Sequence, residues 1–104
     1  MELSNLEFIP GKTITAYHGL VSGSTVRAKH VGKDIFASIK NIFGGELKAY
    51  TELLSESREE SIKRLIAEAR DVGANAVVNV RFSTSSIAAG ASELYVYGTA
   101  VTVE

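Results

Sequence analysis

The chain contains 104 residues, 45% of them hydrophobic, with a mass of 11.1 kDa. Its 11 basic and 12 acidic residues give a net charge of -1, which argues against nucleic-acid binding driven by overall positive charge. The absence of cysteine excludes disulfide bonds, thiolate metal sites and cysteine nucleophiles. A chain of this size can bury one hydrophobic core, so we expect a single domain over residues 1–104.

The amino-terminal ten residues are acidic and contain no apolar run of the length found in a signal peptide. No stretch of about 18 consecutive apolar residues follows anywhere in the chain, so no membrane span is predicted. We therefore expect a cytoplasmic protein without a membrane partner.

The first regular element is predicted as a long strand from Lys12 to Ala28, because this stretch is rich in threonine, valine, isoleucine and tyrosine. Gly19 and Gly23 interrupt it. Since a glycine inside a strand marks a bulge or a close approach of two backbones, the strand is expected to bend.

Two helices are predicted next. A short amphipathic helix begins at Asp34 and continues to Phe43, before the glycine pair at residues 44 and 45. A long helix then runs from Glu46 to Val72 and ends at Gly73. Its predicted apolar stripe consists of Leu47, Tyr50, Leu54, Leu65, Ile66, Ala69 and Val72.

The middle of the long helix, residues 55–61, contains no apolar side chain, which is compatible with a break. A continuous helix is favoured because Ser57 and Ser61 fall on the stripe and are small enough for the helix axis to approach a sheet. Two oppositely charged pairs at i,i+4 spacing, Glu59–Lys63 and Glu60–Arg64, also favour a continuous helix.

Two strands are predicted after the long helix. The first covers 76–83, where Ala76, Val78, Val80 and Phe82 alternate with polar residues. Residues 84–92 are small and polar and predict a hairpin loop, and the last strand covers 93–103. The order strand, helix, helix, strand, strand predicts an α+β fold in which an antiparallel sheet packs on one long helix.

One helix can cover only one face of such a sheet, so we expect apolar side chains on the other face to lie exposed. Those expected there are Tyr17, Val21, Tyr95, Tyr97, Val101 and Val103. A contiguous apolar patch of this kind is unusual on a monomer, and it predicts a homo-oligomer closed by symmetry.

Several stretches resemble the bacterial YbjQ-type family, whose members are described as heavy-metal-binding domain proteins. They are Gly19–Gly23, Asp34–Gly45, Tyr50 ahead of Arg58, Glu68–Arg70, Gly73–Val78 and Tyr97–Val101. The resemblance covers nearly the whole chain. It implies a dodecin-like fold, in which a curved antiparallel sheet wraps around the long helix, and a ring of five subunits.

Residues for metal binding are few. His18 is the candidate metal ligand, and a lone histidine completes a site only if ring symmetry brings copies of it around one axis. Ser24 stands where the family pattern has a glutamate, which weakens a cation site at the first strand. The sequence does not identify a cofactor, and a divalent metal ion is one candidate.

Tyr17, Tyr95 and Tyr97 are candidate cofactor-binding residues, because strand tyrosines at a subunit interface can stack on a planar, flavin-like ligand. Packing of the same rings within the interface is the simpler alternative. No nucleophile and base can be paired in the sequence, so we do not expect an enzyme.

Overall fold

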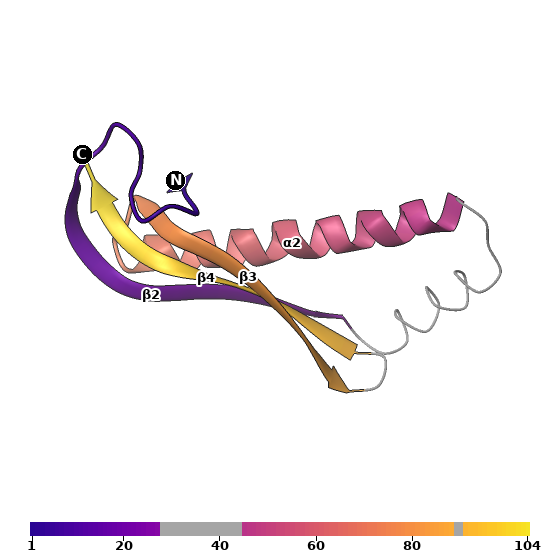
Figure 1. Ribbon diagram of the computed structural model, residues 1–104. Helices are drawn as coiled ribbons and strands as arrows, with labels where there is room; N and C mark the ends of the chain where they lie inside the picture. Colours follow the sequence, from indigo (N-terminus) through magenta and orange to yellow (C-terminus); the bar gives the residue numbers. More distant parts are fainter. Residues whose placement is uncertain (28–44, 89–90) are drawn as a thin grey trace.

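The computed structural model describes residues 1–27, 45–88 and 91–104 (Figure 1). The predicted short helix from Asp34 to Phe43 lies outside these residues. The described elements are strands β1 (Glu2–Leu3), β2 (Ile14–Arg27), β3 (Ala76–Ala88) and β4 (Ala91–Val103) and helix α2 (Gly45–Asp71). They form an α+β fold, as predicted.

The four strands form one mixed sheet in the order β1-β3-β4-β2. Strand β4 pairs antiparallel with both β2 and β3, whereas β1 pairs parallel with β3. The prediction of a wholly antiparallel sheet was therefore wrong at β1. This two-residue strand has no strand pattern of its own, and backbone hydrogen bonds extend its pairing, from Ser4 N to Val77 O at 2.9 Å and from Val80 N to Ser4 O at 3.0 Å.

Strands β3 and β4 are longer than predicted. Residues 84–88 continue β3 and pair with the start of β4, for example Thr84 with Leu94 and Ser85 with Glu93, where the sequence predicts a loop. The pairing uses backbone N–H and C=O groups, which residues with small polar side chains carry just as apolar residues do. Gly90, expected near the loop tip, lies outside the described residues.

Both predicted roles of glycine are found in β2. Its pairing with β4 shifts register between Tyr17 and Gly19, and Gly19 has φ +106°, so this glycine supports a bulge. Gly23 lies beneath α2, where a Cβ atom would overlap the Ser61 carbonyl oxygen and lie 2.6 Å from the Leu65 amide nitrogen. The helix backbone therefore rests directly on the strand at this point.

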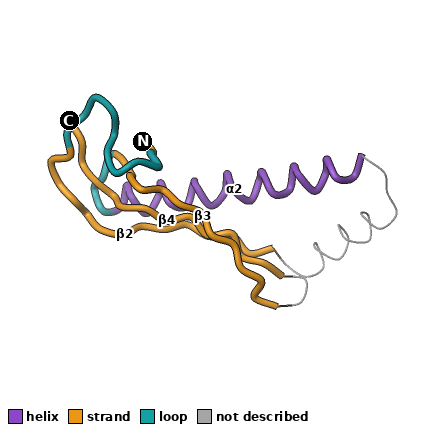
Figure 2. Tube along the Cα trace, in the orientation of Figure 1, coloured by secondary structure: helices purple, strands orange, loops and turns teal. Residues whose placement is uncertain are grey.

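Helix α2 is continuous through residues 55–61, as predicted, and ends ahead of Gly73, which has φ +85°. Ser57 and Ser61 are buried at 2% and 0% exposure, as the small-residue argument requires. Leu65 and Ala69 are fully buried, but Leu54 and Val72 of the predicted stripe are exposed. The first half of the helix diverges from the sheet and Val72 follows the helix end, so neither side chain reaches the core (Figures 1 and 2).

The sheet carries one apolar cluster on each face. Under α2 the cluster contains Val21, Leu65, Ala69, Ala74, Val77, Val96 and Ala100, with Val80 packed against it. On the other face it contains Ile9, Ala76, Val78, Val101 and Val103, with Ile14 packed against it. Ile9 belongs to residues 4–13, the N-terminal segment, which covers this second face in part.

Two predictions about side chains were wrong. Val21, Val101 and Val103 are buried and not exposed: Val21 faces α2, whereas Val101 and Val103 lie on the predicted face and pack there with Ile9. Val80 packs under α2 and not beside Val78, because β3 shifts register between Val78 and Arg81. Asn79, with φ +54°, lies at this bulge, and one extra residue reverses the alternation after it.

We predict that Gly23→Ala lowers stability by about 1–3 kcal/mol, because the added methyl group overlaps the α2 backbone, which cannot move away freely. Thermal unfolding followed by circular dichroism at one protein concentration measures the effect. Ser24→Ala, the next residue of the same strand, is the matched control and should leave the midpoint nearly unchanged. Equal midpoints for the two variants would contradict the close contact.

Candidate functional site

The structure separates the three candidate tyrosines. Tyr95 and Tyr97 stack on each other, with ring centroids 5.5 Å apart and planes inclined by 28°. Tyr17 pairs with Val101, whereas Tyr97 pairs with Ser22. The step of four positions along β4 from Tyr97 to Val101 corresponds to about 13 Å. One planar ligand therefore has two separate places to stack within a chain, and no platform formed by all three rings.

His18, the candidate metal ligand, lies in the β2 bulge and is exposed. Its Nε2 atom is 2.7 Å from the Thr102 hydroxyl oxygen. In residues 1–27, 45–88 and 91–104, no three histidine, aspartate or glutamate side chains come close enough to hold one metal ion. His18 thus has a hydroxyl neighbour within its own chain and belongs to no three-ligand cluster in the described part of it.

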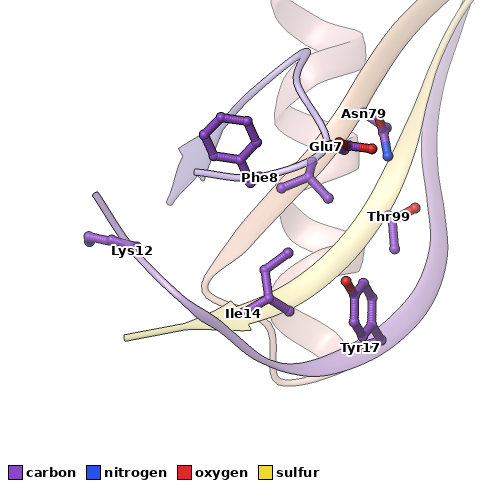
Figure 3. A pocket seen from close by; sticks show the side chains of 8 residues that line it. Glu7, Phe8, Lys12, Ile14, Tyr17, Asn79 and Thr99 are labelled. Atoms are coloured by element: carbon purple, nitrogen blue, oxygen red, sulfur yellow. The ribbon is translucent and has the colours of Figure 1, made fainter. Parts of the chain in front are cut away.

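An open pocket of about 440 Å³ lies between the N-terminal segment and the sheet (Figure 3). We call it the N-terminal pocket. It is lined by Glu7, Phe8, Lys12, Ile14, Tyr17, Val78, Asn79 and Thr99. Only Tyr17 among these was a predicted site residue. The others come from the N-terminal segment and from three neighbouring strands, so their positions in the sequence gave no sign that they share a cavity.

Four of the five polar side chains that line this pocket have no hydrogen-bond partner among the described residues. Within the described part of the chain, the side chains of Glu7, Tyr17 and Thr99 make no hydrogen bond, and neither does the side-chain amide of Asn79. Lys12 is different, because its Nζ atom pairs with Glu2 at 3.2 Å, and Figure 3 shows its side chain apart from the others.

Asn79 is held in place by its backbone. Its φ of +54° is in the left-handed region, which asparagine tolerates better than most residues. Its backbone nitrogen donates to the Leu6 carbonyl at 2.7 Å. No sequence signal marks Asn79, because a polar residue between Val78 and Val80 also fits the alternation of an ordinary strand.

The sequence motif from Gly73 to Val78 has a structural role. Gly73 ends α2, and the Asn75 side chain bonds both backbone groups of Val103, accepting from its nitrogen at 2.8 Å and donating to its oxygen at 3.0 Å. The Asn75 side chain thereby takes the place of a neighbouring strand's backbone at the end of β4. The motif joins helix to sheet and adds no ligand to the pocket.

Comparison with known proteins identifies relatives. Residues 1–104 match the family model YbjQ_1, described as "Putative heavy-metal-binding". A UPF0145 protein of Hahella chejuensis is 62% identical over 104 residues and all of both chains. A UPF0145 protein of Psychrobacter arcticus is 66% identical over 101 residues, 97% of this chain and 64% of the relative.

A solved structure supports the fold. It is the crystal structure of a protein of unknown function in the DUF74 family from Pediococcus pentosaceus, which superimposes with a TM-score of 0.66 at 12% identity and covers 100% of this chain and 98% of its own. At this identity the likeness concerns the fold alone. Within the described ranges, no helix is both long enough and apolar enough to cross a lipid bilayer.

The described residues do not fit a heavy-metal site within one chain. Soft metals prefer thiolate and thioether ligands, and the sequence has no cysteine and one methionine, at its first position. No buried polar side-chain atom in the described residues lacks a hydrogen-bond partner, so no buried group there is left unpaired for a metal ion.

We therefore predict that zinc, copper and nickel, each titrated into the protein in a calorimeter, give no saturable heat above a buffer blank. His18→Ala serves as the comparison and should give the same trace. A saturable isotherm that this substitution removes would contradict the prediction and would show that several copies share His18 around an axis.

Proposed function

This chain belongs to the YbjQ family of UPF0145 proteins, and we propose that it acts as a ring-forming domain of five copies without enzymatic activity. The dodecin-like arrangement that the sequence resemblance implies is part of this proposal. What carries it is the position of apolar side chains at the two opposite edges of one sheet.

The first edge is β2. Leu20 and Val26, which we call the β2 edge surface, are 71% and 53% exposed. Both pair with residues of β4 that face away from the α2 cluster, Leu20 with Thr99 and Val26 with Glu93. Long edge strands with apolar side chains invite pairing with another chain.

Side chains of α2 already occupy the middle of this edge. Glu68 accepts from the Ser22 amide nitrogen at 3.4 Å, and Arg64 donates to the Ser24 carbonyl while it pairs with Glu60 at 3.3 Å. The Glu60–Arg64 pair predicted from the sequence is thus present. Since the Ser22 nitrogen and the Ser24 carbonyl oxygen are already bonded to α2, we expect a partner to contact β2 through Leu20 and not through a continuous ladder of backbone hydrogen bonds.

The second edge is formed by β1 and β3. Leu3, Val80 and Phe82, which we call the β3 edge surface, line a hollow of about 410 Å³ together with Ser4, Asn5 and Arg81. Leu3 and Phe82 are 36% and 44% exposed. A hollow with apolar walls at this edge complements a protruding leucine at the other.

Contact between different surfaces favours a ring. The sheet order puts the β2 edge surface and the β3 edge surface at opposite ends of the sheet. A two-fold dimer would pair one surface with itself and leave the other exposed, whereas a head-to-tail contact covers both and closes if the rotation allows. The radius of gyration of the chain is 16.7 Å, against about 13 Å for a compact chain of this length, so the single chain is elongated.

We predict that light scattering after gel filtration gives about five times the 11.1 kDa of one chain. Leu20→Lys and Phe82→Lys should each give single chains, because either charge breaks the head-to-tail contact at an exposed position. Val72→Lys, exposed but outside both surfaces, is the control and should keep the ring.

Mixing the two charged variants tests the head-to-tail geometry. The Leu20→Lys chain keeps an intact β3 edge surface and the Phe82→Lys chain an intact β2 edge surface, so the mixture should form two-chain complexes and nothing larger. Wild-type protein that runs as a single chain would overturn the ring, and a mixture that stays monomeric would overturn the contact between these surfaces.

A second candidate function is binding of a planar, flavin-like ligand, favoured by the stacked Tyr95–Tyr97 pair. Both rings are half-buried on the sheet face opposite α2. A third ring system could continue the stack.

We predict that protein reconstituted with riboflavin or flavin mononucleotide retains a visible absorbance band after gel filtration and that Tyr97→Ala loses it. Tyr17→Ala is the matched control, since Tyr17 lies apart from the stacked pair. Wild-type protein that retains no flavin would remove this second function and would leave the ring proposal untouched.

A further inference from the structure

We propose that the N-terminal pocket binds a small primary ammonium ion that carries one apolar or aromatic group. Its lining residues belong neither to the two edge surfaces nor to the stacked tyrosines, and all of them come from one chain.

The polar side of the pocket is rich in oxygen atoms that can accept hydrogen bonds. Glu7, Tyr17, Asn79 and Thr99 line it, each side chain carries an oxygen that can accept a hydrogen bond, and none has a side-chain partner among the described residues. An ammonium group has three donors and no acceptor, so it can satisfy several such oxygens at once.

The charge of the pocket selects a cation over an anion. Lys12 is the one positively charged lining residue, and its ammonium group is paired with Glu2 at 3.2 Å. The carboxylate of Glu7 has no positively charged partner in the described part of the chain. A bound carboxylate or phosphate would therefore lie next to an unpaired negative charge, whereas an ammonium ion would form a charge-assisted hydrogen bond with it.

The other side of the pocket is apolar. Ile14, Val78 and the rings of Phe8 and Tyr17 contribute to it. The two rings are 48% and 71% exposed, so their faces are accessible, and Figure 3 shows them on different elements, Phe8 on the N-terminal segment and Tyr17 on β2. Aromatic faces attract cations and apolar groups alike, which suits an ammonium ion with a hydrocarbon body.

Asn79 gives the pocket a fixed wall. A non-glycine residue in the left-handed region costs free energy, and such residues concentrate at ligand sites because the surrounding structure holds them there. Here the hydrogen bond to the Leu6 carbonyl ties the bulge of β3 to the N-terminal segment, so the two walls are joined. The volume of about 440 Å³ is in the range of small-ligand pockets.

Three probes of one size test the proposal by calorimetry on the wild-type protein: 2-phenylethylamine, 2-phenylethanol and phenylacetate. They share the ring and the two-carbon arm and differ in charge. We expect the amine to bind at least about tenfold more tightly than the alcohol and the acid, because only the amine gains the charge-assisted contact with Glu7.

Variants assign the contact to residues. Glu7→Gln should reduce the affinity for the amine to that for the alcohol, and Asn79→Gly, which keeps the left-handed backbone and removes the amide, should weaken the amine several-fold. Glu52→Gln, an exposed carboxylate on α2, is the matched control and should bind the amine like the wild type.

Three results would overturn the proposal: no saturable binding of the amine, equal affinities for the three probes, or an unchanged amine affinity in Glu7→Gln. Each of these is independent of the mass of the assembly, so a failure here is distinguishable from a failure of the ring.

Discussion

The contact on which the rest of the structure depends is the crossing of α2 over β2 at Gly23. The Ser61 carbonyl and the Leu65 amide occupy the space that a side chain at this position would need. Because the two backbones approach so closely, Leu65 and Ala69 are fully buried against the sheet. The same proximity lets Arg64 and Glu68 reach the outward backbone groups of β2. The absence of a side chain at Gly23 thus allows the helix to lie against the strand and to bond backbone groups at the β2 edge.

The second face of the sheet is covered by a different and smaller element. Ile9 of the N-terminal segment packs with Val78, Val101 and Val103, and hydrogen bonds from Ser4 and Asn79 hold the segment to β3. A segment of ten residues cannot cover the whole face, so Leu20 and the Tyr95–Tyr97 pair stay outside it. The gap between segment and sheet is the N-terminal pocket. The exposed apolar positions and the cavity therefore have one origin, which is the small size of this cover.

The family motifs describe how the chain folds more than what it binds. Gly73 and Asn75 end the helix and attach the following strand to Val103. The polar groups that line the pocket are scattered instead, at residues 7, 17, 79 and 99, and they converge through the pairing of β2, β4 and β3. Likewise His18, the one predicted metal ligand, gains a hydroxyl contact and is part of no three-ligand cluster among the described residues.

The sequence by itself determined the features that depend on neighbouring residues: the continuous α2 with its small serines toward the sheet, a bent first strand with glycines at its irregular points, and the strand nature of β2, β3 and β4. Tertiary structure alone decided the parallel pairing of β1, the extension of β3 through residues 84–88, the reversal of Val80 after the bulge at Asn79 and the separation of Tyr17 from the other tyrosines. The physical reason is range. Periodicity reports which side of its own element a residue occupies, whereas pairing partners, register shifts and shared cavities arise from backbone contacts between distant segments.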